Sequence, residues 1–423
     1  MNTTTGGAVR NRTLVMTFLV IAYTLNFIDR QIIGILAEPI KQDLGLTDAE
    51  LGWMGGTAFA LFYTFLAIPL AMLADRKDRS WIISIGLFFW SLMTAVCGLA
   101  QNFWQLFLAR MGVGVGEAAG VAPAYSLISD LYPAEQRARA LAIFSLGIPF
   151  GSALGVLFGG LLAAQVDWRF AFIAIGFAGV LFAPVFKWVV RDPGHGRSDE
   201  APRGAAPSLG TVLGTLARKP AFWFLSFGAG TASLVAYGLA FWIPSFLARS
   251  YGLDLVDRSL IYAAIAFVGG AAGIWFGGVF GDRLGNAHPR GYALVPAIAF
   301  AVTLPAYLIA FATENLFLAS LLFLIPTALG LAWLGPVVTA VTRLVPAEMR
   351  ATASALFLFI NNLVGLGLGT TVIGAISDAL SSRYGDEALR YSAMATTLLY
   401  ALAALLMLLA ARRLSRDLYS APA

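Results

Sequence analysis

Four ionisable side chains stand inside long apolar stretches of this 423-residue chain. Asp29 and Arg30 are adjacent, and Arg110 precedes Glu117 by two helical turns, which places both on one helix face. A charge at the middle of a membrane helix costs at least ~2.5–3.5 kcal/mol, so such residues are candidates for function by default. Burial raises the pKa of a carboxyl group and a nearby arginine lowers it again. We therefore expect Asp29 and Glu117 to take up and release protons, with Arg110 tuning their pKa values.

Each of these roles has an alternative. Asp29 with an arginine, or Glu117 with Arg110, could form a fixed ion pair that only holds helices together. Arg30 could bind an anionic head group, or it could instead pair with Glu117 or Asp29.

Aromatic residues make up 13% of the chain, and several stand on the same stretches as these charges. An apolar, aromatic cavity with few charges suits an amphipathic substrate, although each aromatic side chain taken alone could face lipid or pack between helices. The candidate substrate-binding residues are Arg30, Phe27, Tyr125, Tyr237, Phe241, Trp242 and Asn361.

The composition indicates an all-α integral membrane protein. Hydrophobic residues make up 59% of the chain and charged residues 12%, about half the charge of an ordinary soluble protein. A helix needs ~20 apolar residues to cross the hydrocarbon core of a bilayer. The sequence predicts twelve spans, near 13–40, 50–74, 81–100, 104–130, 138–164, 168–190, 220–247, 258–281, 291–312, 316–342, 351–379 and 391–411.

Lysine and arginine placement predicts the orientation of these spans. With the N-terminus inside, cytoplasmic segments hold 20 of the 28 basic residues, the outer loops hold six, and two lie within spans. We therefore expect a multi-pass protein of the plasma membrane (the inner membrane in a bacterium) with both termini cytoplasmic. The first span starts without a small-residue cleavage site before it, so we expect no cleaved signal.

The two halves of the chain repeat each other. Gly45-Leu46 before the second span matches Gly252-Leu253 before the eighth, at an offset of 207. Pro133–Ala138 (PAEQRA) matches Pro346–Ala351 (PAEMRA) at an offset of 213. The sequence therefore predicts an N-terminal six-helix half at 1–190, a polar linker at 191–219 and a C-terminal six-helix half at 220–423, with a substrate site between the halves near the membrane midplane.

The repeat does not extend to the buried charges. At these offsets Asp29 corresponds to Ala236, and Glu117 corresponds to Gly330. A structural role would have been duplicated with the scaffold, so this asymmetry favours a functional role for the first-half charges.

The loop after the second span resembles the signature of the major facilitator superfamily, Gly-x-x-x-Asp-Arg-x-Gly-Arg. It reads AMLADRKDR at Ala71–Arg79, with both glycines replaced, and the second copy, GVFGDRLG at Gly278–Gly285, is more faithful. Within that superfamily, NFIDR at Asn26–Arg30 and GVGEAA at Gly114–Ala119 resemble the spinster family. The resemblance implies the twelve-helix fold, alternating access, the same two carboxylates, and export of sphingosine phosphate or lysophospholipids.

The superfamily resemblance also implies a cytoplasmic gate, in which loop charges latch the two halves together. The alternative is that these charges are only solvated, positive-inside loop residues. The candidate gate residues are Asp75, Arg79, Asp130, Arg137, Asp282, Arg283 and Arg350. In the fifth span Gly147, Gly151, Gly155 and Gly159 recur every four residues, and such a face permits close helix contact.

Other functions are less consistent with the sequence. A transporter of small organic anions such as sugar acids would use the same Arg30 but needs more polar cavity residues. A channel would not need paired halves with loop latches. An enzyme is disfavoured because we find no nucleophile–base set and no metal cluster, and Cys97 is the one cysteine. We expect a monomer that uses the proton gradient and needs no cofactor or metal. Its expected partners are a small amphipathic or anionic substrate and the lipid bilayer. The net charge of +5 reflects basic cytoplasmic loops rather than nucleic-acid binding.

Overall fold

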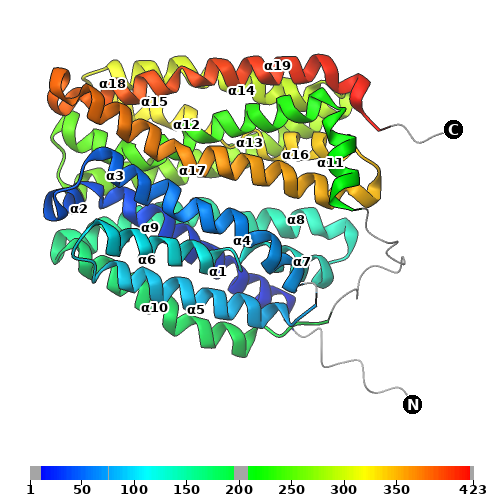
Figure 1. Ribbon diagram of the computed structural model, residues 1–423, viewed down its shortest axis with the longest axis horizontal. Helices are drawn as coiled ribbons and strands as arrows, with labels where there is room; N and C mark the ends of the chain where they lie inside the picture. Colours follow the sequence, from blue (N-terminus) through cyan, green and yellow to red (C-terminus); the bar gives the residue numbers. More distant parts are fainter. Residues whose placement is uncertain (1–10, 75, 195–207, 420–423) are drawn as a thin grey trace. The chain divides into compact units, whose positions relative to one another are not determined.

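The computed structural model describes residues 11–74, 76–194 and 208–419. Every regular element within these ranges is helical, and each of the twelve predicted spans has a helical counterpart (Figure 1). The predicted all-α fold class is confirmed. The first six spans correspond to α1 (Arg12–Ile35) continued by α2 (Ala37–Leu44), α3 (Asp48–Gly52) with η1 (Trp53–Thr57) and α4 (Ala58–Ala74), α5 (Arg79–Cys97), α6 (Phe103–Glu117) with α7 (Val121–Leu131), α8 (Ala134–Ser145) with α9 (Gly147–Gln165), and α10 (Trp168–Val189).

The second set of six spans follows the same order. It comprises α12 (Pro220–Tyr251), α13 (Leu255–Ala287), α14 (Gly291–Ala312), α15 (Leu316–Leu329) with α16 (Leu334–Arg343), α17 (Arg350–Tyr384), and α18 (Ala388–Thr397) with α19 (Leu399–Asp417). Short 3-10 turns, η2 (Ala347–Met349) and η3 (Gly385–Glu387), precede α17 and α18. Among the described residues, ten helical stretches are long and apolar enough to cross a membrane. That number is below twelve because one stretch, Arg350–Asp417, holds two predicted spans and because the segment over 104–130 is not among the ten.

Contacts group the chain into two compact units. One unit contains residues 1–44 and 61–202, and the other contains residues 45–60 and 203–423. The segment Gly45–Ala60 therefore packs with the second unit, although the repeat assigns it to the N-terminal half. The half boundaries taken from the repeat stay a prediction.

Close helix contact in the first unit depends on glycine. α1 packs against α9 and α5 lies beside α10 (Figure 1). A Cβ atom at Gly151 would lie 2.4 Å from the Thr24 carbonyl oxygen, and one at Gly155 would lie 2.8 Å from the Ile28 Cα and carbonyl oxygen. The small-residue face expected in the fifth span is thus used, and it faces α1, which carries Asp29 and Arg30.

The predicted span over 104–130 is broken just after Glu117. α6 ends at Glu117, and the N–H groups of Ala119 and Gly120 bond to the carbonyls three residues earlier. In the second half the helix breaks at the corresponding place, between Leu329 and Leu334. The break is therefore part of the repeated scaffold, and in the first half it leaves a carboxylate at a helix end.

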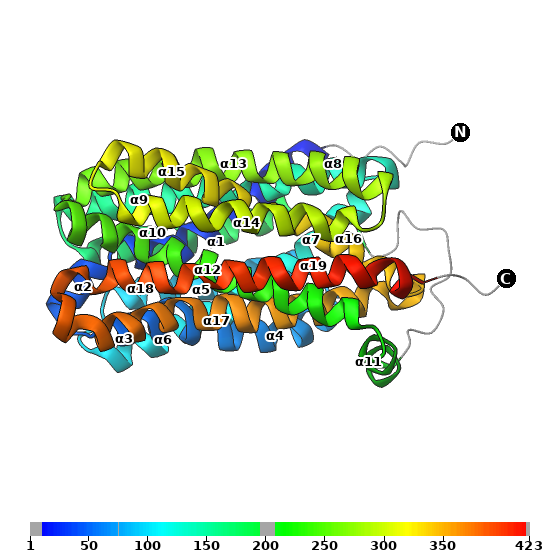
Figure 2. The same ribbon diagram turned by 90° about the horizontal axis from the view of Figure 1, so that it is seen from above.

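In the second unit, α12 packs against α17 and α19 (Figure 2). A Cβ atom at Gly369 of α17 would lie 2.2 Å from the Leu234 carbonyl oxygen of α12. The landmark glycines of the repeat, Gly45 and Gly252, both adopt left-handed backbone conformations, with φ of 65° and 66°. This shared geometry explains why the two turns keep glycine at the same place in each half.

The described part of the predicted linker includes a helix that we did not expect, α11 (Leu209–Ala217). Its first turn is capped by Ser208, whose hydroxyl accepts a hydrogen bond from the Thr211 N–H. Val212 and Leu216 are buried, and α11 contacts α12 and α17. The helix forms because it can bury an apolar face on the second unit. The linker as a whole is polar, so its composition does not reveal this apolar face.

We expect Gly155→Ala to lower the thermal stability of the purified protein by the equivalent of ~1–3 kcal/mol, because the added methyl group meets the α1 backbone, which cannot rotate away. Gly335→Ala is the matched control, since a Cβ atom there has no neighbour within 4 Å. A melting curve for Gly155→Ala that coincides with both wild type and the control would contradict this packing.

Candidate functional site

The four buried charges predicted from the sequence meet within the first unit, where α1 supplies Asp29 and Arg30 and α6 supplies Arg110 and Glu117. The Arg30 Nε lies 2.8 Å from the Glu117 Oε2. The Arg110 Nη1 donates a hydrogen bond to the Asp29 backbone carbonyl at 3.2 Å. Asp29, Arg110 and Glu117 are 3%, 1% and 0% exposed. Two carboxylates and two guanidinium groups thus share one water-poor region.

Arg30 is the most accessible member of this cluster, with 11% of its side chain exposed. Its guanidinium lies over the rings of Phe27, at 5.1 Å, and Tyr63, at 4.6 Å. Aromatic faces stabilise a cation, more so where water is scarce. Arg30 thus pairs with Glu117 within aromatic surroundings, so an incoming anion would compete with a carboxylate.

Three polar side chains that sequence analysis missed surround the carboxylates. Thr94 and Trp90 of α5 lie beside the Asp29 carboxylate, although the Trp90 indole N–H does not reach hydrogen-bond geometry with it, and Asn26 of α1 lies beside the Glu117 carboxylate. Asn26 lies one helical turn before Arg30, and this spacing is the signal that could have identified it. Trp90 carries no such signal.

Glycine brings Trp90 to the site. A Cβ atom at Gly116 of α6 would lie 2.6 Å from the Trp90 backbone nitrogen. α5 can therefore approach α6 closely enough to place the indole beside α1. Cys97, on the same helix as Trp90, is buried near Arg110 and Asp29.

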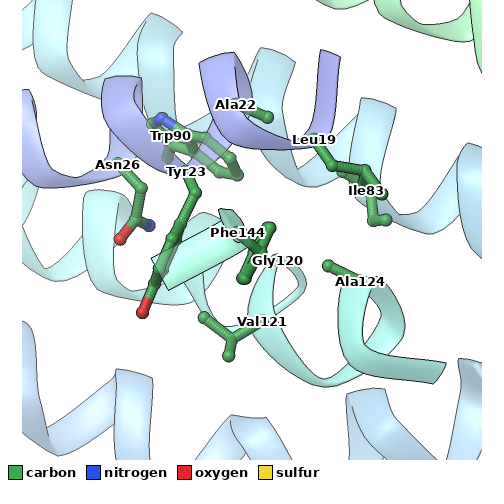
Figure 3. Close-up of a pocket in the computed structure, with 10 residues that line it drawn as sticks. All are labelled: Leu19, Ala22, Tyr23, Asn26, Ile83, Trp90, Gly120, Val121, Ala124 and Phe144. Carbon is green, nitrogen blue, oxygen red and sulfur yellow. The ribbon is translucent and has the colours of Figure 1, made fainter. Parts of the chain in front are cut away.

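A small pocket adjoins this cluster (Figure 3). Most of its wall is apolar, and the Tyr23 ring stacks on Phe144 at 4.3 Å on one side. Its lining residues are Leu19, Ala22, Tyr23, Asn26, Ile83, Trp90, Gly120, Val121, Ala124 and Phe144. Among them, Asn26 and Trp90 also face the carboxylates, so the pocket leads from apolar surroundings to the buried charges.

Two predicted gate residues, Arg79 and Asp130, form an ion pair in the first unit. The Arg79 guanidinium also donates to Ser126 at 2.9 Å and to Asp192 at 2.6 and 3.0 Å. Burial raises the pKa of the Asp192 carboxyl group, but the hydrogen bonds from Arg79 and Gly194 outweigh it and hold that pKa at about 2. Arg79 is thus fully buried and tied to the chain that follows α10, a contact that sequence analysis did not anticipate.

The other gate candidates are less informative. The Arg137 Nε donates to the Tyr132 carbonyl at 3.2 Å, and Arg283 and Arg350 are exposed. Asp75 and the Asp282 side chain lie outside the described residues. The gate across the two halves therefore stays a prediction.

The predicted substrate-binding residues divide between the units. Phe27, Arg30 and Tyr125 belong to the first, and Tyr125 is 40% exposed. Tyr237, Phe241, Trp242 and Asn361 belong to the second. There the Trp242 indole donates to the Thr370 carbonyl at 2.9 Å, and Ser233 donates to the Asn361 side-chain oxygen at 2.9 Å. Both residues are buried between α12 and α17, and Tyr237 is partly exposed.

A second charge cluster, which the sequence analysis missed, joins α3 to α12 and α17 within the second unit. Arg249 grips both oxygens of Asp48, each at 2.7 Å, and the Ser377 hydroxyl donates to Asp48 at 2.7 Å. Asp378 accepts the backbone N–H groups of Asp48 and Ala49 at 3.0 and 2.8 Å. A carboxylate at a helix N-terminus is favoured by the free N–H groups there.

The signal for this cluster lies in the repeat. Asp48 follows Gly45 by three residues, and Arg249 precedes Gly252 by three. Opposite charges thus flank the two matching turns. We name Asp48, Arg249, Ser377 and Asp378 the Asp48 cluster.

Comparison with known proteins identifies relatives of this chain. Residues 19–370 match the Major Facilitator Superfamily. An MFS-type efflux pump of Mycolicibacterium smegmatis is 35% identical over 373 residues, covering 88% of this chain and 86% of that protein. The human protein spinster homolog 1 is 31% identical over 397 residues, covering 89% of this chain and 75% of that protein.

A solved structure agrees with these sequence matches. The crystal structure of a bacterial homolog of the human lysosomal transporter spinster superposes with a TM-score of 0.87 at 32% identity, covering 96% of this chain and 98% of that one. The similarity therefore extends over nearly the whole fold.

We expect Asp192→Asn to destabilise the protein by about 1–2 kcal/mol at pH 7, since the pKa of about 2 lies below that of an unfolded aspartate and water screens part of the effect. The native pKa is depressed, so the stabilisation is complete above about pH 5 and is lost as the pH falls toward 2. Melting temperatures of wild type and variant should differ equally at pH 7 and pH 5, and the difference should shrink as the pH falls from about 4 toward 2. Asp386→Asn, at an exposed carboxylate, should match wild type at pH 7. A difference that already disappears between pH 7 and pH 5 would contradict the assignment.

Proposed function

We propose that this chain, which belongs to the major facilitator superfamily and within it to the spinster family, is a proton-linked secondary active transporter of a lipid-like amphipathic anion. Sphingosine phosphate and lysophospholipids are the substrate type that the family resemblance implies. The observation that carries the proposal is the buried Arg30–Glu117 ion pair with Asp29 beside it. We further propose that the protein is a monomer of the plasma membrane or bacterial inner membrane, with both termini in the cytoplasm.

The ion pair offers a way to couple a proton to an anion. Arg30 can make a strong ionic contact with the Glu117 carboxylate or with the anionic head group of a substrate, but not with both at once. When a phosphate takes Arg30, Glu117 loses its partner in a water-poor region, and a proton then compensates its charge. Loss of the proton restores the Arg30–Glu117 pair and displaces the anion. Asp29, beside Arg110, is the second proton carrier in this scheme.

The surroundings of Arg30 favour an amphipathic substrate. The guanidinium lies against Phe27 and Tyr63, and the exposed ring of Tyr125 lies on the neighbouring helix α7. A phosphate can accept two parallel hydrogen bonds from one guanidinium, and an alkyl chain can then follow the aromatic wall. A sugar acid would require more polar partners than this wall provides.

The Asp48 cluster supports alternating access. It fastens α3, which starts the predicted second span, to α12 and α17 of the second unit through a bidentate ion pair and two helix-terminal hydrogen bonds. We propose that this cluster breaks and reforms during the transport cycle. Such polar contacts can be exchanged for water at modest cost, unlike an apolar seal.

Proton coupling predicts that Asp29→Asn and Glu117→Gln each abolish transport driven by a pH gradient in proteoliposomes, because neither amide can carry a proton. Burying a neutral amide costs less than burying a charge, so the thermal stability of Asp29→Asn should hold or rise. Glu117→Gln should fold but melt at a lower temperature, because it takes a carboxylate away from the largely buried Arg30 guanidinium. Asp43→Asn, which removes a partly exposed carboxylate paired with Arg169, is the control and should transport normally. Full gradient-driven transport by both single variants would remove the mechanism.

Substrate chemistry predicts that affinity rises ~4-fold for each methylene added to the alkyl chain until the apolar wall is filled, since each buried methylene contributes ~0.8 kcal/mol. Arg30→Ala should weaken binding of a lysolipid phosphate by ~10–100-fold, the value of a charge-assisted contact. Arg30→Lys should restore only part of it, because lysine cannot make the paired contact. Calorimetry with a homologous lysolipid series would measure this. Affinity that ignores chain length, or tight binding of a short sugar acid, would favour a transporter of small organic anions instead.

A further inference from the structure

Three buried polar atoms beside the charge cluster make no hydrogen bond within the described chain. They are the side-chain oxygen Oδ1 of Asn26, the indole Nε1 of Trp90 and the carboxylate oxygen Oε1 of Glu117. The three residues are 2%, 1% and 0% exposed, respectively, so bulk water does not reach them. Buried polar atoms are nearly always paired with protein or with ordered water. Two acceptors and one donor that remain unmatched in one region therefore indicate a missing polar partner.

The pocket of Figure 3 provides the space for that partner. Asn26 and Trp90 form part of its wall, and Gly120 lies one turn beyond Glu117. The pocket is large enough to admit a water molecule. A buried water makes about three hydrogen bonds and needs two to four polar partners. The pocket therefore has room for ordered water beside Asn26 and Trp90.

The geometry points to one ordered water held by Asn26 and Trp90 as the partner of these atoms. We propose that this water accepts a hydrogen bond from the Trp90 indole N–H, donates one to the Asn26 Oδ1, and directs its second O–H toward the Glu117 Oε1. Each of the three unmatched atoms then has a partner of the right kind. The rest of the pocket wall is mostly apolar and offers the water no equally accessible hydrogen-bond acceptor.

The position of this water gives it a role in proton exchange, and that role rests on the proposed proton coupling. The Arg30 guanidinium holds the Glu117 Oε2, which leaves Oε1 as the oxygen that can receive a proton. The water can pass one of its protons to Oε1 while it takes up a proton arriving from the pocket mouth, so the water itself is unchanged. Asn26 and Trp90 act as positioning residues for this step, since neither gives up a proton.

The other titratable groups around the site do not offer a similar route. Arg30 and Arg110 keep their protons at all relevant pH values. Asp29 faces Trp90 and Thr94, and Cys97 lies buried near Arg110. The remaining titratable side chains that surround the site from α1, α4 and α7 are Tyr23, Tyr63 and Tyr125. Of the two carboxylates, Glu117 is the one with an oxygen, Oε1, that makes no hydrogen bond within the described chain.

The first experiment tests the site itself. A structure of the wild-type protein at a resolution that shows ordered solvent should contain a water ~3 Å from both the Trp90 Nε1 and the Asn26 Oδ1. A dry pocket would overturn the proposal. This measurement does not depend on whether transport uses protons.

The second experiment tests the relay by displacing the water without touching a polar group. Ala22→Val fills the pocket from α1, and Val121→Ala, in the same pocket wall, enlarges it as a matched control. We expect Ala22→Val to slow transport driven by a pH gradient at least 10-fold, while substrate exchange at equal pH on both sides of the membrane stays at the wild-type rate. Val121→Ala should leave both rates unchanged.

The outcomes separate this inference from the proposed function. Gradient-driven transport at the wild-type rate by an Ala22→Val protein whose pocket is dry would overturn the relay. A wild-type protein indifferent to the pH gradient would refute proton coupling and the relay with it, while the solvent density would still decide whether the water site exists. Equal loss of gradient-driven transport and of exchange in Ala22→Val would also overturn the relay, because it would indicate a packing defect.

Discussion

Charge buried within apolar helices is the constraint around which the first unit is arranged. Asp29, Arg110 and Glu117 are almost wholly inaccessible, and an ionised side chain in such a place must find a partner or lose its charge. The partners stand on different helices, so α1, α5 and α6 have to approach closely. Gly116 lets α6 approach Trp90 of α5, and Gly155 lets α9 approach Ile28 of α1 from the other side. Packing and charge therefore specify the same arrangement.

The duplicated scaffold and the unduplicated charge suggest a division of labour between the halves. The turns at Gly45 and Gly252 share a left-handed glycine, and the helices that follow 103 and 316 break at matching places. At the break, the first half carries Glu117 and the second carries Gly330. The same backbone feature thus places a buried carboxylate at a helix end in one half and a glycine in the other, which fits an arrangement in which the first half carries the buried charge of this region.

The spans and the buried charges could be predicted from the sequence because each follows from one-dimensional information. A run of ~20 apolar residues identifies a span, and a rare charge inside it identifies a candidate site. The helix break after Glu117 escaped notice because Ala118–Gly120 continue an apolar stretch, although Pro123, in the first turn of α7, is a signal for it. Asn26 and Trp90 escaped notice because their importance comes from neighbours on other helices.

Contacts made by loops and helix ends were the hardest to foresee. Arg249 counted only as an outer-loop cation, yet it holds Asp48 from a position 201 residues away. Asp192, in the predicted linker, holds Arg79 in the same manner. α11 lies in a segment whose average composition is polar, so its apolar face could not be recognised from composition. Each case depends on a three-dimensional partner, and a residue's own type and spacing do not reveal it.

The single cysteine of the chain has a practical consequence for studying this protein. Cys97 is buried inside the helices of the first unit, so a thiol reagent applied to the folded protein should find little to modify. The natural chain can therefore be used for site-directed cysteine labelling without first replacing a native cysteine. A cysteine introduced beside Ser377 would be the one readily reachable thiol, and its rate of alkylation would report, in the intact membrane, how often the helices around Asp48 part to admit water.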